Sequence, residues 1–466
     1  MALYHSRTRK PSRGRKLSRD LRGVAGSEPA ALALIRGSSA GEISASAEKA
    51  IRTGTLRALE SLPPVRRLAE HLSVSPTTAQ AAYRDLQLRG LVTASGRRGT
   101  QVSARPTVSP LPVVDVPAGV RDLSTGNPDP AFLPSLPDRL HRLNGRQSLY
   151  GESPYVADLL DLAVDRYRAD GIKPDSLAIV GGALDGIERT MAAHLRPGDR
   201  VGVEDPGFHS LFDLILALGL IPEPIAVDDL GLVPQGLEAS VRRLSAVVVT
   251  PRAQNPTGAA LDGRRATELR QVLATCPDIL LLEDDHFGPA SGAESHTLTG
   301  GQEHWAVIRS SSKALGPDLR VAVVAGDTVT ISRVEGRQRV GAGWVSRLLQ
   351  GLVADMLRDP NVDRLIQSAT REYAKRRHAL ISALAEQRIT GRGRSGLNVW
   401  VEVPDEGEAL AKLLRAGWSA SAGERFRLRS APGIRISVGA MQAGEAPAIA
   451  AALGSPAVAV PRTRSG

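Results

Sequence analysis

Two hydrophobic patterns divide the chain. Between residues 40 and 102, apolar positions recur at helical spacing, as at Ile43, Ala47 and Ala50, and further helices are expected at 65–72 and 76–89. From residue 122 onward, short apolar runs alternate with helical stretches. The runs expected as strands span residues 177–180, 200–203, 246–250, 279–282, 306–308 and 321–325. This alternation predicts an α/β fold with a mostly parallel sheet sandwiched by helices.

The helical region ends in a predicted hairpin. Pro76 can occupy the first position of the third helix, and Gly90 follows its last residues as a stop. Residues 91–94 and 100–102 then flank a glycine-bounded tip that carries Arg97 and Arg98. Three short helices and a basic hairpin predict a winged helix-turn-helix, in which the N-terminal end of the third helix enters the major groove.

Charge separates the same two regions. The whole chain has a formal net charge of +10; residues 1–105 hold 19 Lys+Arg and 7 Asp+Glu, so they carry +12. The remaining residues hold 40 basic and 42 acidic groups, a net of −2. The excess positive charge at one end predicts a polyanionic partner for that end, most simply double-stranded DNA.

Other classes of protein are disfavoured. No run approaches the ~18 apolar residues of a membrane span, and no apolar core of signal-peptide type follows the basic N-terminus. The single cysteine, Cys276, excludes an intramolecular disulfide and is expected to be an inert structural residue. We therefore expect a cytoplasmic protein without a membrane partner, and the sequence predicts no metal site.

Three segments carry the chemistry of the second region: 255–258 (Asn-Pro-Thr-Gly), 283–286 (Glu-Asp-Asp-His) and 310–320, which begins Ser-Ser-Ser-Lys. They supply a lysine for a Schiff base, an acid for a pyridine nitrogen, an amide for a ring oxygen, and hydroxyls plus an arginine for a phosphate. Those are the groups that a pyridoxal phosphate site requires. The chemical residues also follow predicted strands, where open α/β sheets bind ligands.

The N-terminal region resembles the winged helix-turn-helix of the GntR family. Residues 62–69, 74–78, 82–90 and 97–100 follow the family pattern, except that Pro76 stands where the family has an arginine. One expected DNA contact is therefore missing. By resemblance, the residues that contact DNA are Arg66, Thr77, Thr78, Gln80, Gly96, Arg97 and Arg98. The alternative is a small helical protein-interaction module.

Residues 122–450 resemble the class I/II aminotransferases, which have fold type I. The resemblance implies that Lys313 forms the Schiff base, that Asp284 pairs with the pyridine nitrogen, and that Asn255 donates to the phenolic oxygen. It also implies that Phe208 stacks on the ring and that Tyr150 reaches the phosphate of a neighbouring subunit, hence a homodimer. The phosphate cup is expected to comprise Gly182, Ala183, Leu184, Ser310, Ser312 and Arg320.

Two further positions concern the effector and the ring. Arg435 matches an arginine that clamps an amino acid carboxylate, although an ordinary salt bridge is the alternative. His286 stands where the family usually has a tyrosine that donates to the phenolic oxygen. Histidine can also donate, but it titrates near pH ~6.5 and is placed differently. Cofactor binding should survive this change, whereas efficient transamination is put in doubt.

The layout as a whole resembles the MocR subfamily of GntR regulators. It implies a pyridoxal phosphate-dependent transcriptional regulator that senses an amine, an amino acid or pyridoxal phosphate itself and changes operator binding, with no net turnover expected. Two alternatives stay open: a working aminotransferase with an accessory nucleic-acid module, and a scaffold that has lost the cofactor.

The predicted boundaries follow from these patterns. Residues 1–38 are expected to form a disordered basic tail, 39–104 the winged helix-turn-helix, and 105–121 a proline-containing linker. Residues 122–454 are expected to form the aminotransferase-like domain, with a smaller C-terminal α/β subdomain at about 360–454. Residues 455–466 are expected to be a flexible tail.

Overall fold

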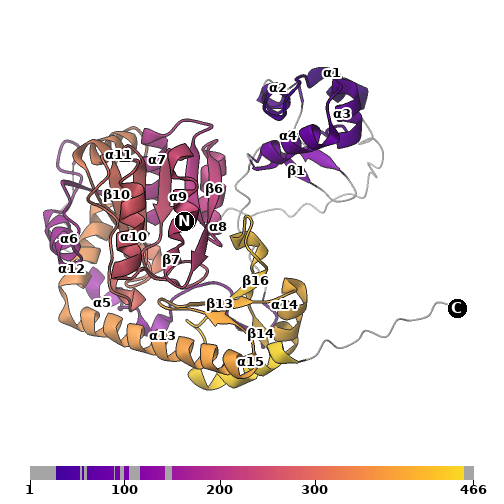
Figure 1. The fold of residues 1–466 in the computed structure, drawn as a ribbon. Coiled ribbons are helices and arrows are strands. Elements are labelled where there is room, and N and C mark those ends of the chain that lie inside the picture. Colours follow the sequence, from indigo (N-terminus) through magenta and orange to yellow (C-terminus); the bar gives the residue numbers. More distant parts are fainter. Residues whose placement is uncertain are drawn as a thin grey trace, which may run out of the picture. The chain divides into compact units, whose positions relative to one another are not determined.

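The computed structural model describes residues 28–52, 55–56, 60–88, 90–94, 99–103, 116–141 and 149–455. The chain divides into two compact units, with the boundary between Thr107 and Val108. Each unit has a hydrophobic core of its own. Figure 1 shows both units, with many of their elements labelled.

The first unit contains four helices and a two-stranded sheet within the described residues. They are α1 (Glu28–Leu34), α2 (Ala40–Arg52), α3 (Val65–Leu72), α4 (Pro76–Leu88), β1 (Val92–Ala94) and β2 (Thr100–Val102). The strands are antiparallel, and Val92 lies opposite Val102. The inward faces of α2, α3 and α4 meet in one core around Tyr83, whose hydroxyl donates to the Pro63 carbonyl at 2.7 Å. A winged helix-turn-helix topology results.

Part of the predicted N-terminal tail is wrong. Residues 28–34 form α1, and Ala31 and Ile35 are buried in the core of the first unit. Ser38 is ordered as well, because its backbone N–H donates to the Glu42 carboxylate at 2.8 Å at the start of α2. The segment holds six consecutive apolar residues, 30–35, which show no helical period and therefore did not reveal this helix. Residues 1–27 lie outside the described residues.

The second unit is built on an eight-stranded sheet of order β4-β11-β10-β9-β8-β5-β6-β7. Its strands are β4 (Ser176–Val180), β5 (Arg200–Asp205), β6 (Ile221–Asp228), β7 (Gly231–Leu232), β8 (Ala246–Val249), β9 (Leu280–Asp285), β10 (Trp305–Ser310) and β11 (Ala322–Gly326). The pairs from β10 through β9, β8 and β5 to β6 are parallel, whereas β11 is antiparallel to both of its neighbours. The predicted mostly parallel sheet is confirmed.

Sequence reasoning did not predict β6. Its segment contains Pro222 and Pro224, which argue against a central strand because proline cannot donate to a ladder. The strand is tolerated because its outer neighbour, β7, covers only its last residues. The remaining edge of β6 therefore needs few donors.

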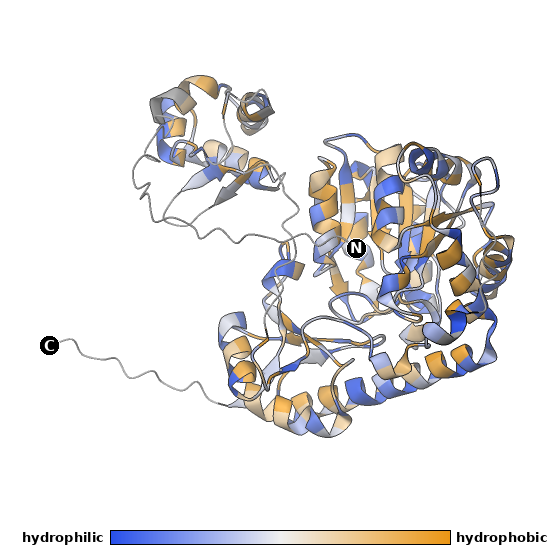
Figure 2. Ribbon diagram, turned by 180° about the vertical axis from the view of Figure 1, so that it is seen from behind, coloured by the Kyte–Doolittle hydropathy of each residue, from blue (hydrophilic) through white to orange (hydrophobic). Residues whose placement is uncertain are grey.

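Helices cover both faces of this sheet. Its strands have side chains that alternate between two cores, one face meeting α7 (Ala183–His194), α8 (His209–Ala217) and α11 (Thr328–Val340). The other face meets α6 (Ala157–Ala169), α10 (Gly263–Leu273) and α12 (Arg347–Arg358). Two shorter helices, α5 (Pro137–Leu140) and α9 (Pro234–Glu238), complete this part of the unit. Figure 2 shows the central strands as mainly hydrophobic, as expected for a sheet buried on both faces.

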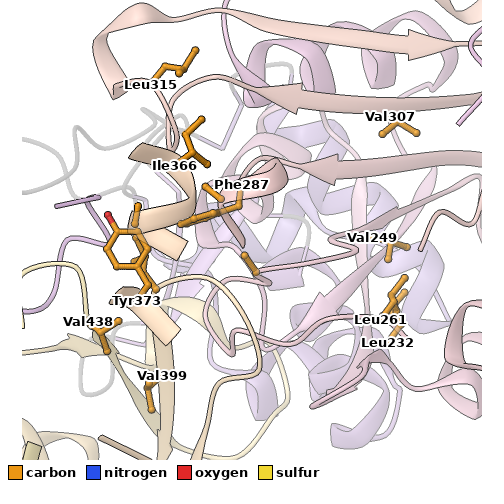
Figure 3. Close-up of a cluster of buried hydrophobic side chains, with 14 of the residues drawn as sticks. Leu232, Val249, Leu261, Phe287, Val307, Leu315, Ile366, Tyr373, Val399 and Val438 are labelled. Atoms are coloured by element: carbon orange, nitrogen blue, oxygen red, sulfur yellow. The ribbon is translucent and has the colours of Figure 1, made fainter. Parts of the chain in front are cut away.

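A smaller α/β part follows α13 (Pro360–Glu386). Its four-stranded sheet has the order β12-β13-β16-β15, flanked by α14 (Glu406–Arg415) and α15 (Ala446–Gly454). The strands are β12 (Gly391–Arg392), β13 (Asn398–Glu402), β15 (Ser421–Ala422) and β16 (Gly433–Ser437). Tyr373 on α13, Val399 and Val438 continue the same buried cluster as the central sheet, as Figure 3 shows.

The N-terminal residues of the second unit add to this smaller part. β3 (Arg121–Asp122) pairs in parallel with β14 (Trp418–Ser419). Arg121 was expected within the linker, so the packed unit begins slightly earlier than predicted. Residues 105–115 of the predicted linker and 456–466 of the predicted tail lie outside the described residues.

Candidate cofactor and DNA-binding sites

Lys313 lies just after the end of β10, in the turn that leads to β11. Its Nζ donates to the Gly126 carbonyl at 2.8 Å. Burial, followed by the nearby positive charge of Arg435, lowers the pKa of Lys313 from its ordinary value to about 8. A substantial fraction of this amine is therefore neutral near physiological pH, which is the form that attacks a carbonyl.

Asp284 and His286 lie at and just beyond the end of β9, the strand beside β10. Asp284 is 6% exposed, and its Oδ1 is buried without a hydrogen-bond partner. The other oxygen, Oδ2, lies 3.6 Å from His286 Nδ1, which is also buried and lacks a hydrogen bond. A buried polar atom without a partner is costly unless a ligand supplies one.

Asn255 and Arg435 contact each other across the two parts of the unit. Arg435 Nη1 donates to Asn255 Oδ1 at 2.9 Å, and Nη2 donates to the Ser124 carbonyl. The Arg435 guanidinium also lies over the ring of Phe426, with Cζ 4.8 Å from the centroid. Burial, followed by the charge of Arg425, lowers the pKa of Arg435 to about 10. Among the described residues, no acidic side chain is hydrogen-bonded to Arg435, so an ordinary salt bridge does not describe its geometry.

A glycine-rich turn joins β4 to α7 beside Arg320. Arg320 Nη2 donates to the Gly181 carbonyl at 2.9 Å. Gly182 has φ +120°, a backbone conformation that L residues with side chains rarely adopt, and a Cβ there would lie 2.4 Å from Arg320 Nη2 and displace that side chain. Gly182 precedes α7, whose first residues include Ala183 and Leu184 and which has no side-chain cap. Uncapped backbone N–H groups at a helix start favour an anion.

Ser310 and Ser312 lie at the start of the turn that contains Lys313, directly at and after the end of β10. Their hydroxyls are 2.9 Å apart, and the Ser312 N–H donates to Ser310 Oγ at 3.2 Å. The intervening Ser311 instead donates to the Val321 carbonyl at 2.8 Å and thereby ties the turn to the sheet. The triple-serine run thus serves two purposes, one of them structural.

The two predicted aromatic residues lie in different surroundings. Phe208 immediately precedes α8, and its ring centroid is 5.3 Å from that of His209. Tyr150 is 92% exposed, and it packs edge-to-face on Trp344 with the centroids 5.5 Å apart. The fold of a single chain therefore does not bring Tyr150 to the other site residues, and its role in a neighbouring subunit stays a prediction.

Asp285, the residue after Asp284, belongs to a separate buried ion network. Both of its oxygens accept from Arg252, at 2.8 Å each, and Oδ2 also accepts from Arg309 at 2.8 Å. Both arginines reach Asp170 as well, at 3.0 and 2.7 Å. Burial alone would raise the pKa of Asp285, but the two arginines hold it below its ordinary value.

Sequence reasoning missed several residues that line the site. Ser124 and Gly126 supply carbonyls to Arg435 and Lys313, and Phe426 supplies the ring beneath Arg435. The turn signal of 124–128 (Ser-Thr-Gly-Asn-Pro) was available, but nothing in it indicates a distant lysine. Phe426 has no local signal, because its neighbourhood arises only when the smaller part packs on the larger one.

The predicted DNA contacts lie on α3 and α4 where the structure describes them. Arg66, Thr77 and Gln80 are exposed, whereas Thr78 is half-buried. The Thr78 N–H donates to Ser75 Oγ at 3.0 Å, which caps the start of α4. The predicted wing residues Gly96, Arg97 and Arg98 lie outside the described residues.

No helix in the described part of the chain is both long and apolar enough to span a bilayer.

Both regions match known protein families. Residues 118–453 match the family described as aminotransferase class I and II, and residues 40–102 match the bacterial regulatory proteins of the gntR family. The first match covers most of the chain. The predicted resemblances to the two families are thereby confirmed.

Individual proteins agree with this assignment. The vitamin B6 salvage pathway transcriptional repressor PtsJ of Salmonella typhimurium is 40% identical over 423 residues, covering 90% of this chain and 98% of that protein. The HTH-type transcriptional regulator TauR of Rhodobacter capsulatus is 27% identical over 418 residues, covering 78% and 84%. Among solved structures, Pyrococcus horikoshii kynurenine aminotransferase superposes with a TM-score of 0.66 at 20% identity, covering 72% and 91%; this likeness shows the fold.

One chain thus combines a GntR winged helix with a class I/II aminotransferase fold. A relative with 40% identity matches it along 98% of that relative's length. The cofactor of such domains is pyridoxal phosphate. The chain belongs to the HTH-type transcriptional regulators in which a GntR-family DNA-binding domain is fused to a class I/II aminotransferase-like domain.

Proposed function

We propose that this regulator holds pyridoxal phosphate at Lys313 and that occupancy of this site changes how the winged helix binds its operator. The observation that carries the proposal is the site itself: a buried lysine amine with a pKa of about 8 just after β10, and a buried carboxylate with an unpartnered oxygen, Asp284, near the end of the neighbouring strand β9. Neither feature stabilises the protein alone. Both are accounted for by a ligand with an aldehyde and a protonated ring nitrogen.

The remaining site residues fit the same cofactor. Asp284 would pair with the ring nitrogen, and Asn255 and His286 would lie on the phenolic side. Phe208 would stack on the ring. The phosphate would be held by the start of α7 and nearby side chains, namely Gly182, Ala183, Leu184, Ser310, Ser312 and Arg320. When bound, the cofactor supplies an electron-withdrawing ring, while the protein supplies orientation, charge and exclusion of water.

Arg435 would hold the carboxylate of an amino acid effector. Its guanidinium is buried, it has no acidic hydrogen-bond partner, and Asn255 already orients one of its nitrogens. A planar arginine fork suits a carboxylate because two parallel hydrogen bonds form at once. Pyridoxal phosphate itself is the second candidate for the signal, and the name of the Salmonella relative, a repressor of vitamin B6 salvage, supports it.

DNA would be contacted by the exposed residues Arg66, Thr77 and Gln80, by Thr78, and by the wing residues Gly96, Arg97 and Arg98. The net charge of +12 over residues 1–105 supports phosphate contacts by this unit. We place the protein in the cytoplasm, where its operator lies.

A homodimer completes the proposal. Several large apolar side chains are exposed, among them Trp344, which packs against Tyr150, and exposed apolar surface favours association. They include Leu140, Leu149, Tyr150, Val340, Trp344 and Leu348. In a dimer, Tyr150 would reach the phosphate of the neighbouring site, and two winged helices would engage repeated half-sites with a gain in avidity. The ligand acts by binding the two arrangements of the dimer unequally.

A working aminotransferase is the second candidate function. It is favoured by the fold and by the joint presence of Lys313, Asp284 and Arg435. His286 disfavours it, because a histidine replaces the tyrosine that the family usually places beside the cofactor oxygen. We expect no sustained turnover of an amino acid with a keto acid.

Comparison of Lys313→Ala with the wild type tests the main proposal. The probe is DNA from upstream of the protein's own gene, mixed with protein and with or without pyridoxal phosphate. We expect the cofactor to change the affinity of the wild type and to have no effect on Lys313→Ala. Lys375→Ala is the matched control, since Lys375 is an exposed residue on α13. An unchanged cofactor response in Lys313→Ala would contradict the proposal.

A further inference from the structure

Asp205, at the end of β5, makes a set of hydrogen bonds that the cofactor site does not require. Its carboxylate accepts from the backbone N–H groups of Leu428, Arg429 and Ser430 at 2.9, 2.7 and 2.9 Å. The Ser430 hydroxyl adds a fourth bond at 2.9 Å. Asp205 is 5% exposed, so these bonds form with little competition from water.

The segment that Asp205 holds, residues 424–430, bridges the two parts of the unit; we call it the clasp. At one end, Glu406 on α14 accepts from the Glu424 N–H at 2.7 Å and pairs with Arg427 at 2.8 Å. At the other end, Leu428 packs against the core on one face of the central sheet. The clasp is thus fixed to the smaller part by Glu406 and to the larger part by Asp205.

The clasp places Phe426 between the two halves of the ligand site. The Gly207 N–H donates to the Phe426 carbonyl at 2.8 Å, next to the predicted ring-stacking residue Phe208. The Phe426 ring is fully buried, lies 5.3 Å from that of His209, and carries the Arg435 guanidinium on its face. Arg435 therefore has two polar partners, Asn255 and Ser124, and one apolar wall, which the clasp provides.

We propose that Asp205 is a positioning residue that sets the affinity of the site for a carboxylate. By tying down the clasp, it presses Phe426 against Arg435 and keeps the guanidinium dry and in one orientation. A guanidinium so fixed binds a carboxylate without first losing conformational freedom or shedding water. The inference rests on the proposed role of Arg435 and adds to it the device that makes that role effective.

The substitution Asp205→Asn tests this role with nearly the same shape. An asparagine offers one acceptor oxygen where the clasp presents four donors, and its amide nitrogen faces N–H groups that cannot accept. Asp213→Asn is the matched control: Asp213 is an exposed residue on α8 that interacts with the clasp residue Arg425, and its substitution removes the same charge from the same neighbourhood.

The measurement uses two amines that differ only in a carboxylate, L-alanine and ethylamine. Each is titrated into the full-length protein loaded with pyridoxal phosphate, and binding is followed by cofactor absorbance. The preference for alanine over ethylamine should fall about tenfold or more in Asp205→Asn and stay unchanged in Asp213→Asn. Ethylamine affinity should be similar in all three proteins, because this ligand does not use Arg435.

Amide hydrogen exchange reports separately on the clasp. The N–H groups of Leu428, Arg429 and Ser430 should exchange faster in Asp205→Asn than in Asp213→Asn, with or without cofactor. If Asp205→Asn does not fold, Leu428→Ala loosens the clasp at a different contact and should show the same loss of alanine preference.

The outcomes are distinct. Faster exchange in the clasp with an unchanged alanine preference would overturn the role of Asp205 and leave that of Arg435 intact. A wild type that binds alanine no better than ethylamine would overturn the carboxylate role of Arg435, and the present inference with it. An equal loss of alanine preference in Asp205→Asn and Asp213→Asn would show that the effect arises from charge alone. That result would also overturn the positioning role of Asp205.

Discussion

Asp284 and Asp285 are consecutive residues at the end of β9, yet their side chains, on opposite faces of the strand, have opposite surroundings. Asp285 is saturated: Arg252 and Arg309 surround it, and Asp170 balances their charge. Asp284 is also buried, but one oxygen has no hydrogen bond and the other lies 3.6 Å from His286 Nδ1. One aspartate is fully paired within the chain, whereas its neighbour keeps an unpartnered oxygen, which we propose the cofactor satisfies.

The difference teaches how to separate structural from functional charges. Both residues are acids in one four-residue motif, so residue type does not distinguish them. Their partners do, since a buried charge with a complete set of partners in its own chain has nothing to offer a ligand. The same comparison applies to Arg309, which lies three residues before Ser312. Because Arg309 donates to Asp285, it belongs to the buried ion network and not to the phosphate cup.

The largest expected effect on stability comes from removing Asp285, the aspartate whose partners all lie within the chain. Asp285→Ala leaves two buried arginines with only Asp170 as a counter-ion, and it should lower the free energy of unfolding by about 3–5 kcal/mol. Urea denaturation of the cofactor-free protein measures it. Asp284→Ala, one residue away, is the control and should cost far less; equal losses would erase the distinction between the two residues.

The next effect concerns Asp284 and the affinity for the cofactor. Asp284→Asn should weaken pyridoxal phosphate binding roughly 10- to 100-fold, since a hydrogen bond to a charged group contributes about 1.5–3 kcal/mol. Titration with the cofactor, followed by visible absorbance, measures the change. Unfolding of the cofactor-free variant should be nearly unaffected. Undiminished cofactor affinity would show that Asp284 does not contact the ring.

Lys313 gives a pH-dependent test of the same site. Because its pKa in the folded protein is lowered to about 8, the unfolded chain holds more protons between pH 8 and the ordinary lysine value. Stability lost at lower pH is therefore regained as pH rises through this window. Cofactor-free Lys313→Met should be about 3 kcal/mol more stable than the wild type at pH 7, since each pKa unit of the shift corresponds to about 1.4 kcal/mol, with the gap closing toward pH ~10.5.

The measurement is a series of urea denaturations from pH 7 to 10, with Lys375→Met as the control at an exposed position. A gap for Lys313→Met that stays constant with pH would mean that the lysine is not the titrating group.

The smallest expected effect is at His286. His286→Phe removes any donor beside Asp284, and cofactor affinity should fall about fivefold, consistent with a net hydrogen-bond contribution of about 1 kcal/mol. His286→Tyr keeps a donor and should stay close to the wild type. The same absorbance titration compares both variants. A loss in His286→Phe as large as that in Asp284→Asn would place the histidine, not the acid, at the centre of ring binding.

The motifs predicted most of the site because each lies at the end of a strand. The ends of β4, β5, β8, β9 and β10 meet at one edge of the sheet, which brings Gly182, Phe208, Asn255, Asp284 and Lys313 into one region of the fold. Arg435 was predicted from its motif on β16, although its contacts with Asn255 and Ser124 were not. Local patterns failed for α1, where the apolar signal was short, and for β6, where two prolines concealed a strand.

The sequence by itself determined the two-part organisation, the families, and the residues capable of cofactor chemistry, because hydrophobic period, charge and motif order are local properties. Only the tertiary structure decided which acid has a complete set of partners, which carbonyls meet Lys313 and Arg435, and which backbone N–H groups Asp205 binds. Those contacts join positions separated by as many as 311 residues, as between Arg435 and Ser124. No local pattern encodes them, because each depends on how separate strands and loops pack in three dimensions.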